Sequence, residues 1–181
     1  MFTAQPYKKL FTYWFALIIY DLTVEFCNQW IKSWKLKEQM TGAARSGKQN
    51  IVEGSDGMKT SLKIAIKLTN VAKMSLEELL ADYEDFLRQS GLKQWSKNDP
   101  RVVEFRNKSS KLVRNLSNLR RLTQRALLPQ DPERAANLLL TLAHQATFLL
   151  NRQVEALEEK HRKEGGYTEK LYRERKEYRG Y

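Results

Sequence analysis

The 181-residue chain has one cysteine, four prolines and eight glycines. The single thiol, Cys27, excludes a disulfide within the chain, and no Cys/His spacing typical of a zinc site occurs. We expect Cys27 to be a small core residue in a reducing cytoplasm. The scarcity of proline and glycine allows long uninterrupted helices. A chain of this length can form a stable hydrophobic core without disulfide bonds.

An apolar run long enough to cross a membrane is also missing. The best candidate, "LFTYWFALIIYDLTVEFCNQWI" (10–31), is uninterrupted only from Tyr13 to Tyr20, and Asp21 and Glu25 follow at once. No small-residue cleavage site of a signal peptide comes after it. The sequence therefore predicts no membrane contact and a cytoplasmic location.

Strand-like alternation is not found, whereas apolar residues recur at helical spacing along the chain. Gly91 and the Gly165-Gly166 pair are natural helix ends, and Asp131 followed by Pro132 is a typical helix start. The sequence predicts an all-α fold: an antiparallel up-and-down four-helix bundle with an extra basic helical segment and a charged C-terminal tail. We expect helices over about Tyr7–Ser33, Lys35–Glu53, Met58–Gly91, Arg101–Leu127 and Pro132–Glu164.

These breaks divide the chain into three parts. Residues 1–98 hold the first three helices of the bundle. Residues 99–166 hold the basic helical segment and the final long helix, which completes the bundle. Residues 167–181 form the charged tail.

The first helix carries more apolar surface than one neighbouring helix needs. A second apolar flank lies beside its main apolar stripe, so we expect burial on two sides, within the bundle and against another copy of the chain. The residues predicted to form this contact between copies are Trp14, Leu17, Val24 and Ile31.

The second helix contains two interior glycines, Gly42 and Gly47, each costing about 0.5–1 kcal/mol relative to alanine. Ala43, Gly47, Ile51 and Gly54 fall on one face of this helix. Small side chains allow a neighbouring backbone to approach closely and recover dispersion contacts. We therefore expect this helix to be the most crowded one. A phosphate-binding loop is disfavoured, because the first glycine of that pattern and a preceding strand are absent.

The segment "LKEQMTGAARSGKQNIVEGS" (36–55) joins a run of basic and small residues to the ending Asn-Ile-Val-Glu-Gly. It resembles the characteristic segment of the bacterial 23S rRNA intervening-sequence proteins, a four-helix-bundle family. "SLEELLADYEDFLR" (75–88) is similar to the third helix of that family. Residues 136–166 resemble the four-helix-bundle suffix domain attached to some members, and the whole resemblance covers about residues 8–166.

The resemblance implies a helical bundle that assembles as a ring, typically a pentamer. The same fold includes the accessory variability determinant of diversity-generating retroelements, a basic protein that binds nucleic acid and a reverse transcriptase. The implied partners are further copies of the chain, RNA or DNA, and a reverse transcriptase. The added segment 101–127 and the C-terminal helix depart from the core family, which leaves ring size and partner open.

Positive charge is concentrated in one segment of a chain whose net charge is +11. Residues 51–100 have a net charge of −1, whereas residues 101–125 hold eight basic residues and one acid, Glu104, for a net charge of +7. A helical wheel of this segment places Phe105, Leu112, Leu116, Leu119 and Leu122 on the inner face. It places Asn107, Lys111, Arg114, Asn118, Arg121 and Arg125 on the opposite face.

Such a row of cations would neutralise phosphates of a nucleic acid, with affinity that falls steeply as salt rises. A helix face that is merely solvated usually mixes charges of both signs. An assembly scaffold that docks acidic proteins would explain the same charge, so this alternative stays open. The residues predicted to bind nucleic acid are Arg101, Arg106, Lys108, Lys111, Arg114, Arg120, Arg121 and Arg125, with Arg45 and Lys48 on the second helix as a secondary group.

The sequence offers little for catalysis or for a cofactor. His144, with Asn151 two turns further on, is the best polar constellation, and we expect this histidine to anchor a helix contact. Glu158 and His161 have the spacing used in di-iron bundles, but that spacing occurs only once and among solvated charges. We therefore predict a protein that is not an enzyme, with no cofactor and no metal ligands.

Overall fold

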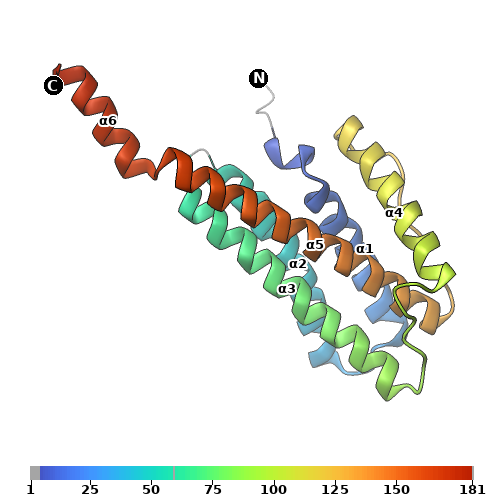
Figure 1. Cartoon of the computed structure of the whole chain (residues 1–181). Coiled ribbons are helices and arrows are strands. Elements are labelled where there is room, and N and C mark those ends of the chain that lie inside the picture. The colour runs from blue at the N-terminus through green and yellow to red at the C-terminus, as the bar shows by residue number, and fades with distance from the viewer. Residues whose placement is uncertain (1–4, 59, 181) are drawn as a thin grey trace.

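The computed structural model describes residues 5–58 and 60–180. Within these ranges the chain is helical and has no strand, which confirms the predicted all-α class (Figure 1). Lys59, inside the third predicted helix, and Tyr181, at the end of the predicted tail, lie outside the described residues. The elements are the 3-10 turn η1 (Pro6–Lys9) and the helices α1 (Phe11–Trp30), α2 (Trp34–Gly57), α3 (Leu62–Gln89), α4 (Pro100–Leu119), α5 (Pro132–Glu164) and α6 (Tyr167–Arg179).

Four of these helices pack around one core. Helix α1 contacts α2, α2 contacts α3, α3 contacts α5, and α5 contacts α1. Helix α4 lies against α5 and α1 on the outside of this group, and α6 extends away from it beyond the end of α5 (Figure 1). The largest fully buried side chains of the core include Trp14, Phe26, Met40, Leu76 and Tyr83.

Several helix ends follow the local chemistry that the sequence predicted. Asp131 caps α5, since its Oδ1 accepts a hydrogen bond from the backbone N of Arg134 at 2.7 Å, and Pro132 follows at the first helical position. Gly91 follows Ser90, the C-cap of α3, and has a φ of +65°, a value that suits glycine. Helix α2 continues about one turn past its predicted end, to Gly57.

Helix α1 is buried on several sides within one chain, because it contacts α2, α5, α4 and η1. Trp14 is 1% exposed and its Nε1 donates a hydrogen bond to the carbonyl O of Lys8 at 2.9 Å; Ile31 is 8% exposed. The prediction that Trp14 and Ile31 contact another copy is therefore wrong, because their surface is already covered inside the chain. Leu17 and Val24 are half-buried.

The small residues of α2 allow close packing against α3. A Cβ atom added to Gly47 would lie 2.8 Å from Cδ2 of Leu76, and one added to Gly54 would lie 3.5 Å from the carbonyl O of Ala65. Gly42 is exposed and has no such neighbour within 4 Å. The predicted crowding is confirmed at Gly47, whereas a Cβ at Gly54 would make ordinary van der Waals contacts and Gly42 lies outside the crowded face.

Helix α4 ends at Leu119, not at Leu127 as the sequence predicted. Arg120 adopts the left-handed conformation, with a φ of 52°, and the chain continues without regular structure to α5. Residues 120–131, which we call the return segment, lead back to the start of α4, where the guanidinium carbon of Arg134 lies 5.2 Å from the ring centre of Phe105. Helices α4 and α5 therefore run in the same direction, side by side.

Chain length explains why the predicted helix to Leu127 is wrong. The 20 residues of α4 span about 30 Å, and the return segment has to cover this distance backwards. If residues 120–127 were helical, only residues 128–131 would remain, and they reach about 14 Å when fully extended. Leu119 and Leu122, predicted to face inward, are 54% and 42% exposed, whereas Leu128 of the return segment is buried.

Gly42 and Gly47 of α2 give a matched test of this packing. Gly47→Leu forces a side chain into the fully buried Leu76, so we expect a loss of about 1–3 kcal/mol in the free energy of unfolding. Gly42→Ala adds a methyl group into open space and improves helix propensity, so we expect a gain of about 0.5–1 kcal/mol. Urea denaturation measures both changes, and equal effects of the two substitutions would contradict the packing.

Candidate nucleic-acid interface

Helix α4 is held by hydrogen bonds along its inner side. Gln145 of α5 accepts a hydrogen bond from Oγ of Ser109 at 2.7 Å and donates from its Nε2 to Oγ of Ser110 at 2.8 Å. Further along, Oγ of Ser117 donates to the carbonyl O of Lys9 at 3.1 Å. These hydrogen bonds fix the rotation of α4 about its axis, so the opposite face is directed to solvent.

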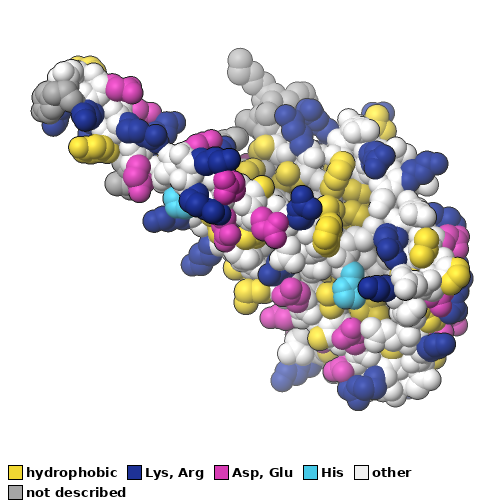
Figure 2. All heavy atoms as spheres, viewed as in Figure 1, with side chains coloured by type: hydrophobic (Ala, Val, Ile, Leu, Met, Phe, Trp, Pro, Cys, Tyr) yellow, Lys and Arg dark blue, Asp and Glu magenta, His cyan; other side chains and the backbone are white. Residues whose placement is uncertain are grey.

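That outer face carries four exposed residues, which we call the basic strip: Asn107, Lys111, Arg114 and Asn118. The helical wheel predicted that these positions face outward. Among the described residues, neither Lys111 nor Arg114 forms an ion pair. Figure 2 shows Lys and Arg side chains, without acidic ones beside them, over the upper part of α4.

Two of the predicted cations are instead neutralised within α4 and its cap. Arg101 Nη2 lies 2.8 Å from Oδ2 of Asp99, and the Arg101 guanidinium carbon lies 3.5 Å from the ring centre of Trp95. Hydrogen bonds from the side chain and backbone of Arg101 lower the pKa of Asp99 from 3.8 to about 2. Lys108 Nζ lies 2.5 Å from Oε1 of Glu104. The positive charges of Arg101 and Lys108 therefore have partners already.

The return segment carries the remaining cations of this region. Arg121 and Arg125 were predicted at the end of the helical stripe, and this placement is wrong because α4 has ended before them. Arg120 and Arg121 are exposed. Arg125 lies toward α1, where it and Asp21 line a hollow of about 230 Å³. Burial raises the pKa of Asp21, and the positive charges of Lys48 and Arg125 oppose that rise.

The secondary group on α2, Arg45 and Lys48, likewise contains one cation near a carboxylate and one exposed cation. Lys48 Nζ lies 4.4 Å from the ring centre of Tyr20, and its charge acts on the same carboxylate, Asp21, as that of Arg125. Arg45 is exposed. The structure thus brings Lys48 and Arg125 to the same carboxylate, Asp21, which the spacing in the sequence did not reveal.

A hollow of about 730 Å³, which we call the cationic hollow, lies between α4 and the return segment. Its floor is aliphatic, with Leu112, Leu138 and Leu142 among its members, and the described residues that line it include no Asp or Glu. One of its cations, Arg134, was not predicted from the sequence, because only the return of the chain brings the first turn of α5 to α4. The cations that line this hollow are Lys108, Lys111, Arg125 and Arg134.

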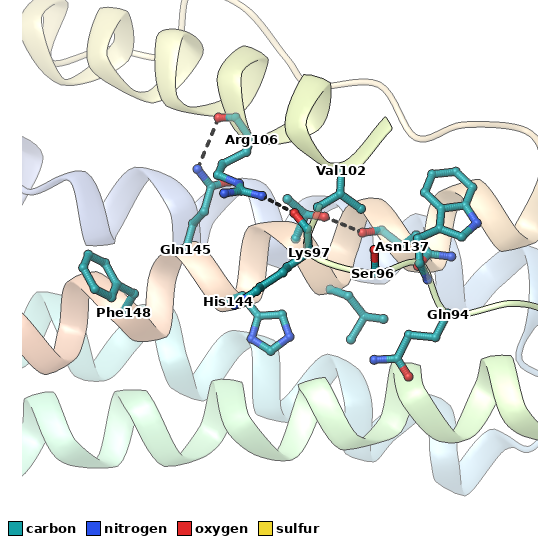
Figure 3. A pocket seen from close by; sticks show the side chains of 12 residues that line it. Gln94, Ser96, Lys97, Val102, Arg106, Asn137, His144, Gln145 and Phe148 are labelled. Carbon is teal, nitrogen blue, oxygen red and sulfur yellow. Dashed lines mark hydrogen bonds between the residues drawn. The ribbon is translucent and has the colours of Figure 1, made fainter. Parts of the chain in front are cut away.

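A second hollow, of about 890 Å³, lies on the other side of α4 and is bordered by residues 94–97 and by α5 (Figure 3). Arg106 reaches across it and donates from Nη2 to the carbonyl O of Lys97 at 2.6 Å. His144 and Phe148 lie one turn apart on α5 and line the same space. The prediction that His144 anchors a helix contact is wrong, since its side chain is exposed. Phe148, absent from the sequence prediction, is 61% exposed, and its position off the apolar stripe of α5 was the available signal.

The cations of α5 and α6 are arranged differently from those of the basic strip. Along these helices Lys and Arg approach Glu residues three or four positions away. The pairs are Arg152–Glu155, Lys160–Glu164, Arg162–Glu159, Lys163–Glu159 and Lys170–Glu174, at 3.2–3.9 Å. These two helices therefore present the mixed charge of an ordinary solvated surface.

Residues 5–58 and 60–180 contain no group of three or more His, Cys, Asp or Glu side chains placed to hold a metal ion. Within the same residues, no helix is both long enough and apolar enough to cross a membrane. Comparisons of the chain with protein-family models, with curated proteins and with solved structures gave no match.

The Asp99–Arg101 pair predicts a difference in acid stability. Because the pKa of Asp99 is lower in the folded chain than its ordinary 3.8, the pair stabilises the fold above about pH 4, and this contribution disappears as the pH falls to about 2. Asp99→Asn should therefore give a free energy of unfolding that falls less between about pH 4 and pH 2 than that of the wild type. Urea denaturation across this range measures the difference. Asp85→Asn, which removes the exposed pair with Arg88, is the control, and parallel curves for wild type and Asp99→Asn would refute the assignment.

Proposed function

We propose that this chain is a non-enzymatic accessory protein that binds RNA or DNA through the basic strip of α4 and the exposed arginines of the return segment. One observation carries the proposal: Lys111, Arg114, Arg120 and Arg121 are exposed and form no ion pair among the described residues. Five cations on α5 and α6, namely Arg152, Lys160, Arg162, Lys163 and Lys170, lie near carboxylates, and the cations of segment 111–121 differ from these five.

The spacing of the strip suits a phosphate backbone. Lys111 and Arg114 lie about 4.5 Å apart along the axis of α4, and the amides of Asn107 and Asn118 flank them. Each cation that neutralises a phosphate releases condensed counterions, which makes the binding dependent on salt. Amide hydrogen bonds to phosphate or sugar position the nucleic acid without reading its sequence. We therefore propose binding that is insensitive to sequence at the strip.

A protein partner is the second candidate. Leu119, Leu122 and Leu127 are 54%, 42% and 85% exposed beside the cations, and exposed leucines favour a protein surface over a phosphate backbone. In this alternative the chain is an assembly scaffold whose positive charge docks an acidic protein.

The resemblance of residues 36–55 to the intervening-sequence proteins extends the proposal to the whole assembly. We propose that α1, α2, α3 and α5 form an antiparallel up-and-down four-helix bundle and that the chain assembles as a pentamer in the cytoplasm. A reverse transcriptase is the proposed protein partner. In a ring the basic strip would be repeated, and several weak contacts would then act together.

Removal of the unpaired cations should weaken binding and reduce its dependence on salt. The variant Lys111→Gln/Arg114→Gln/Arg121→Gln should lower the affinity for a generic single-stranded RNA. It should also reduce the slope of log K against log salt by about 0.7 for each phosphate that the protein no longer neutralises. Fluorescence anisotropy with a labelled oligonucleotide at several salt concentrations measures both quantities.

The control is Lys160→Gln/Arg162→Gln/Lys163→Gln, which changes the net charge equally but removes cations that have glutamate partners. This variant should stay close to the wild type. Equal losses of affinity in the two triple variants would leave only a general effect of net charge and would reject the strip. Unchanged binding in the first variant would reject it too.

The proposed ring is tested by mass. A pentamer of the 21.3 kDa chain should give about 106 kDa in light scattering coupled to gel filtration. Exposed apolar side chains such as Met74 and Ile64, 57% and 50% exposed, supply surface for contacts between copies. A mass of one chain across a range of concentrations would rule out the ring and leave the strip to bind alone.

A further inference from the structure

Phe148 occupies an unusual position on α5. It is a large apolar side chain with 61% of its surface exposed, on a helix whose other apolar residues form the core. It lines the hollow of Figure 3 together with His144, which precedes it by one helical turn and is exposed as well. Both rings are therefore accessible to solvent beside the same hollow.

The surroundings of Phe148 are cationic. Lys97 and Arg106 line the same hollow, and the described residues that line it include no Asp or Glu. Arg106 is next in sequence to Asn107 of the basic strip. A nucleic-acid strand bound to the strip could therefore continue to Arg106 and into this hollow. An apolar protein surface alone would not account for two cations, a histidine and three amide side chains, Gln94, Asn137 and Gln145, along the hollow that Phe148 lines.

The cationic hollow on the other side of α4 lacks this feature. Its aromatic ring, Phe105, is 8% exposed, with Trp95 stacked at 6.0 Å on one side and Arg134 at 5.2 Å. No free ring face remains there for a flat ligand. Of the two hollows, only the one with Phe148 offers exposed rings next to cations.

We propose that Phe148 and His144 form a stacking platform for bases of single-stranded nucleic acid, with Arg106 and Lys97 contacting the phosphates between them. This inference rests on the proposed function and adds the class of substrate to it. Bases in a duplex are stacked on one another and their faces are covered, whereas an unpaired base has a face free to stack on an aromatic side chain. The platform therefore selects single strands over duplexes, while the basic strip binds the phosphates of both.

The test compares one sequence in two forms. The probes are a fluorescein-labelled unstructured RNA of about 12 nucleotides and the same RNA annealed to its complement, both at one fixed salt concentration. Phe148→Ala should weaken binding of the single strand about tenfold or more, the effect typical of losing one stacked base, and leave duplex binding within about twofold. Phe148→Trp should keep the affinity for the single strand, since an indole also stacks.

Tyr172→Ala is the matched control, because it truncates an aromatic side chain of similar exposure, 69% against 61%, on α6 and outside both hollows. It should leave binding of both probes unchanged. Circular dichroism and urea denaturation check that each variant is folded.

The outcomes separate the two proposals. If Phe148→Ala binds both probes as the wild type does, or loses affinity for both equally, the platform is refuted while binding through the strip stands. If the folded wild type binds neither probe, the proposed function fails and the platform fails with it. Loss of single-strand binding in Phe148→Trp as large as in Phe148→Ala would also refute stacking, because shape at this position would then explain the loss.

Discussion

The parallel course of α4 and α5 is the constraint on which the surface of this protein depends. Neighbouring helices joined by a short turn run in opposite directions, but here the chain has to travel back along about 30 Å before α5 begins. The return segment covers this distance without regular secondary structure. Its path brings Arg125 and Arg134 to α4, places Arg125 beside Asp21 of α1, and creates the hollow between α4 and the segment.

The parts of the fold that could be predicted are those decided by local chemistry. The cap at Asp131, the end of α3 at Gly91 and the crowding at Gly47 each depend on residues within one helix or its nearest neighbour. The end of α4 could not be predicted in this way, because the sequence from 120 to 127 contains no helix breaker. What ends the helix is the distance to the start of α5, which only the arrangement of the helices sets. The burial of Trp14 by η1 and its neighbours likewise depends on the whole chain.

The candidate site was predictable to a similar extent. Helical periodicity placed Asn107, Lys111, Arg114 and Asn118 on an outward face, since their positions depend only on the geometry of α4. The ion pairs that these cations form with acidic residues were harder to predict. Lys108 has a glutamate four positions earlier, a local signal, but Arg101 is held by an aspartate in its helix cap and by the ring of Trp95 from the preceding segment. Arg134 and Phe148 join the cations of α4 from another helix, and no pattern within one segment of the sequence indicates such a meeting.

The cationic hollow affects the stability of the part of the molecule in which it lies. Four positive side chains from three stretches of chain repel one another above an aliphatic floor, and nearby carboxylates, Glu104 for Lys108 and Arg134 and Asp21 for Arg125, offset part of this repulsion. An anion bound in the hollow reduces the remaining repulsion, so anion binding and the packing of residues 120–131 against α4 stabilise each other. The stability of this edge of the molecule is therefore linked to the anions in the medium.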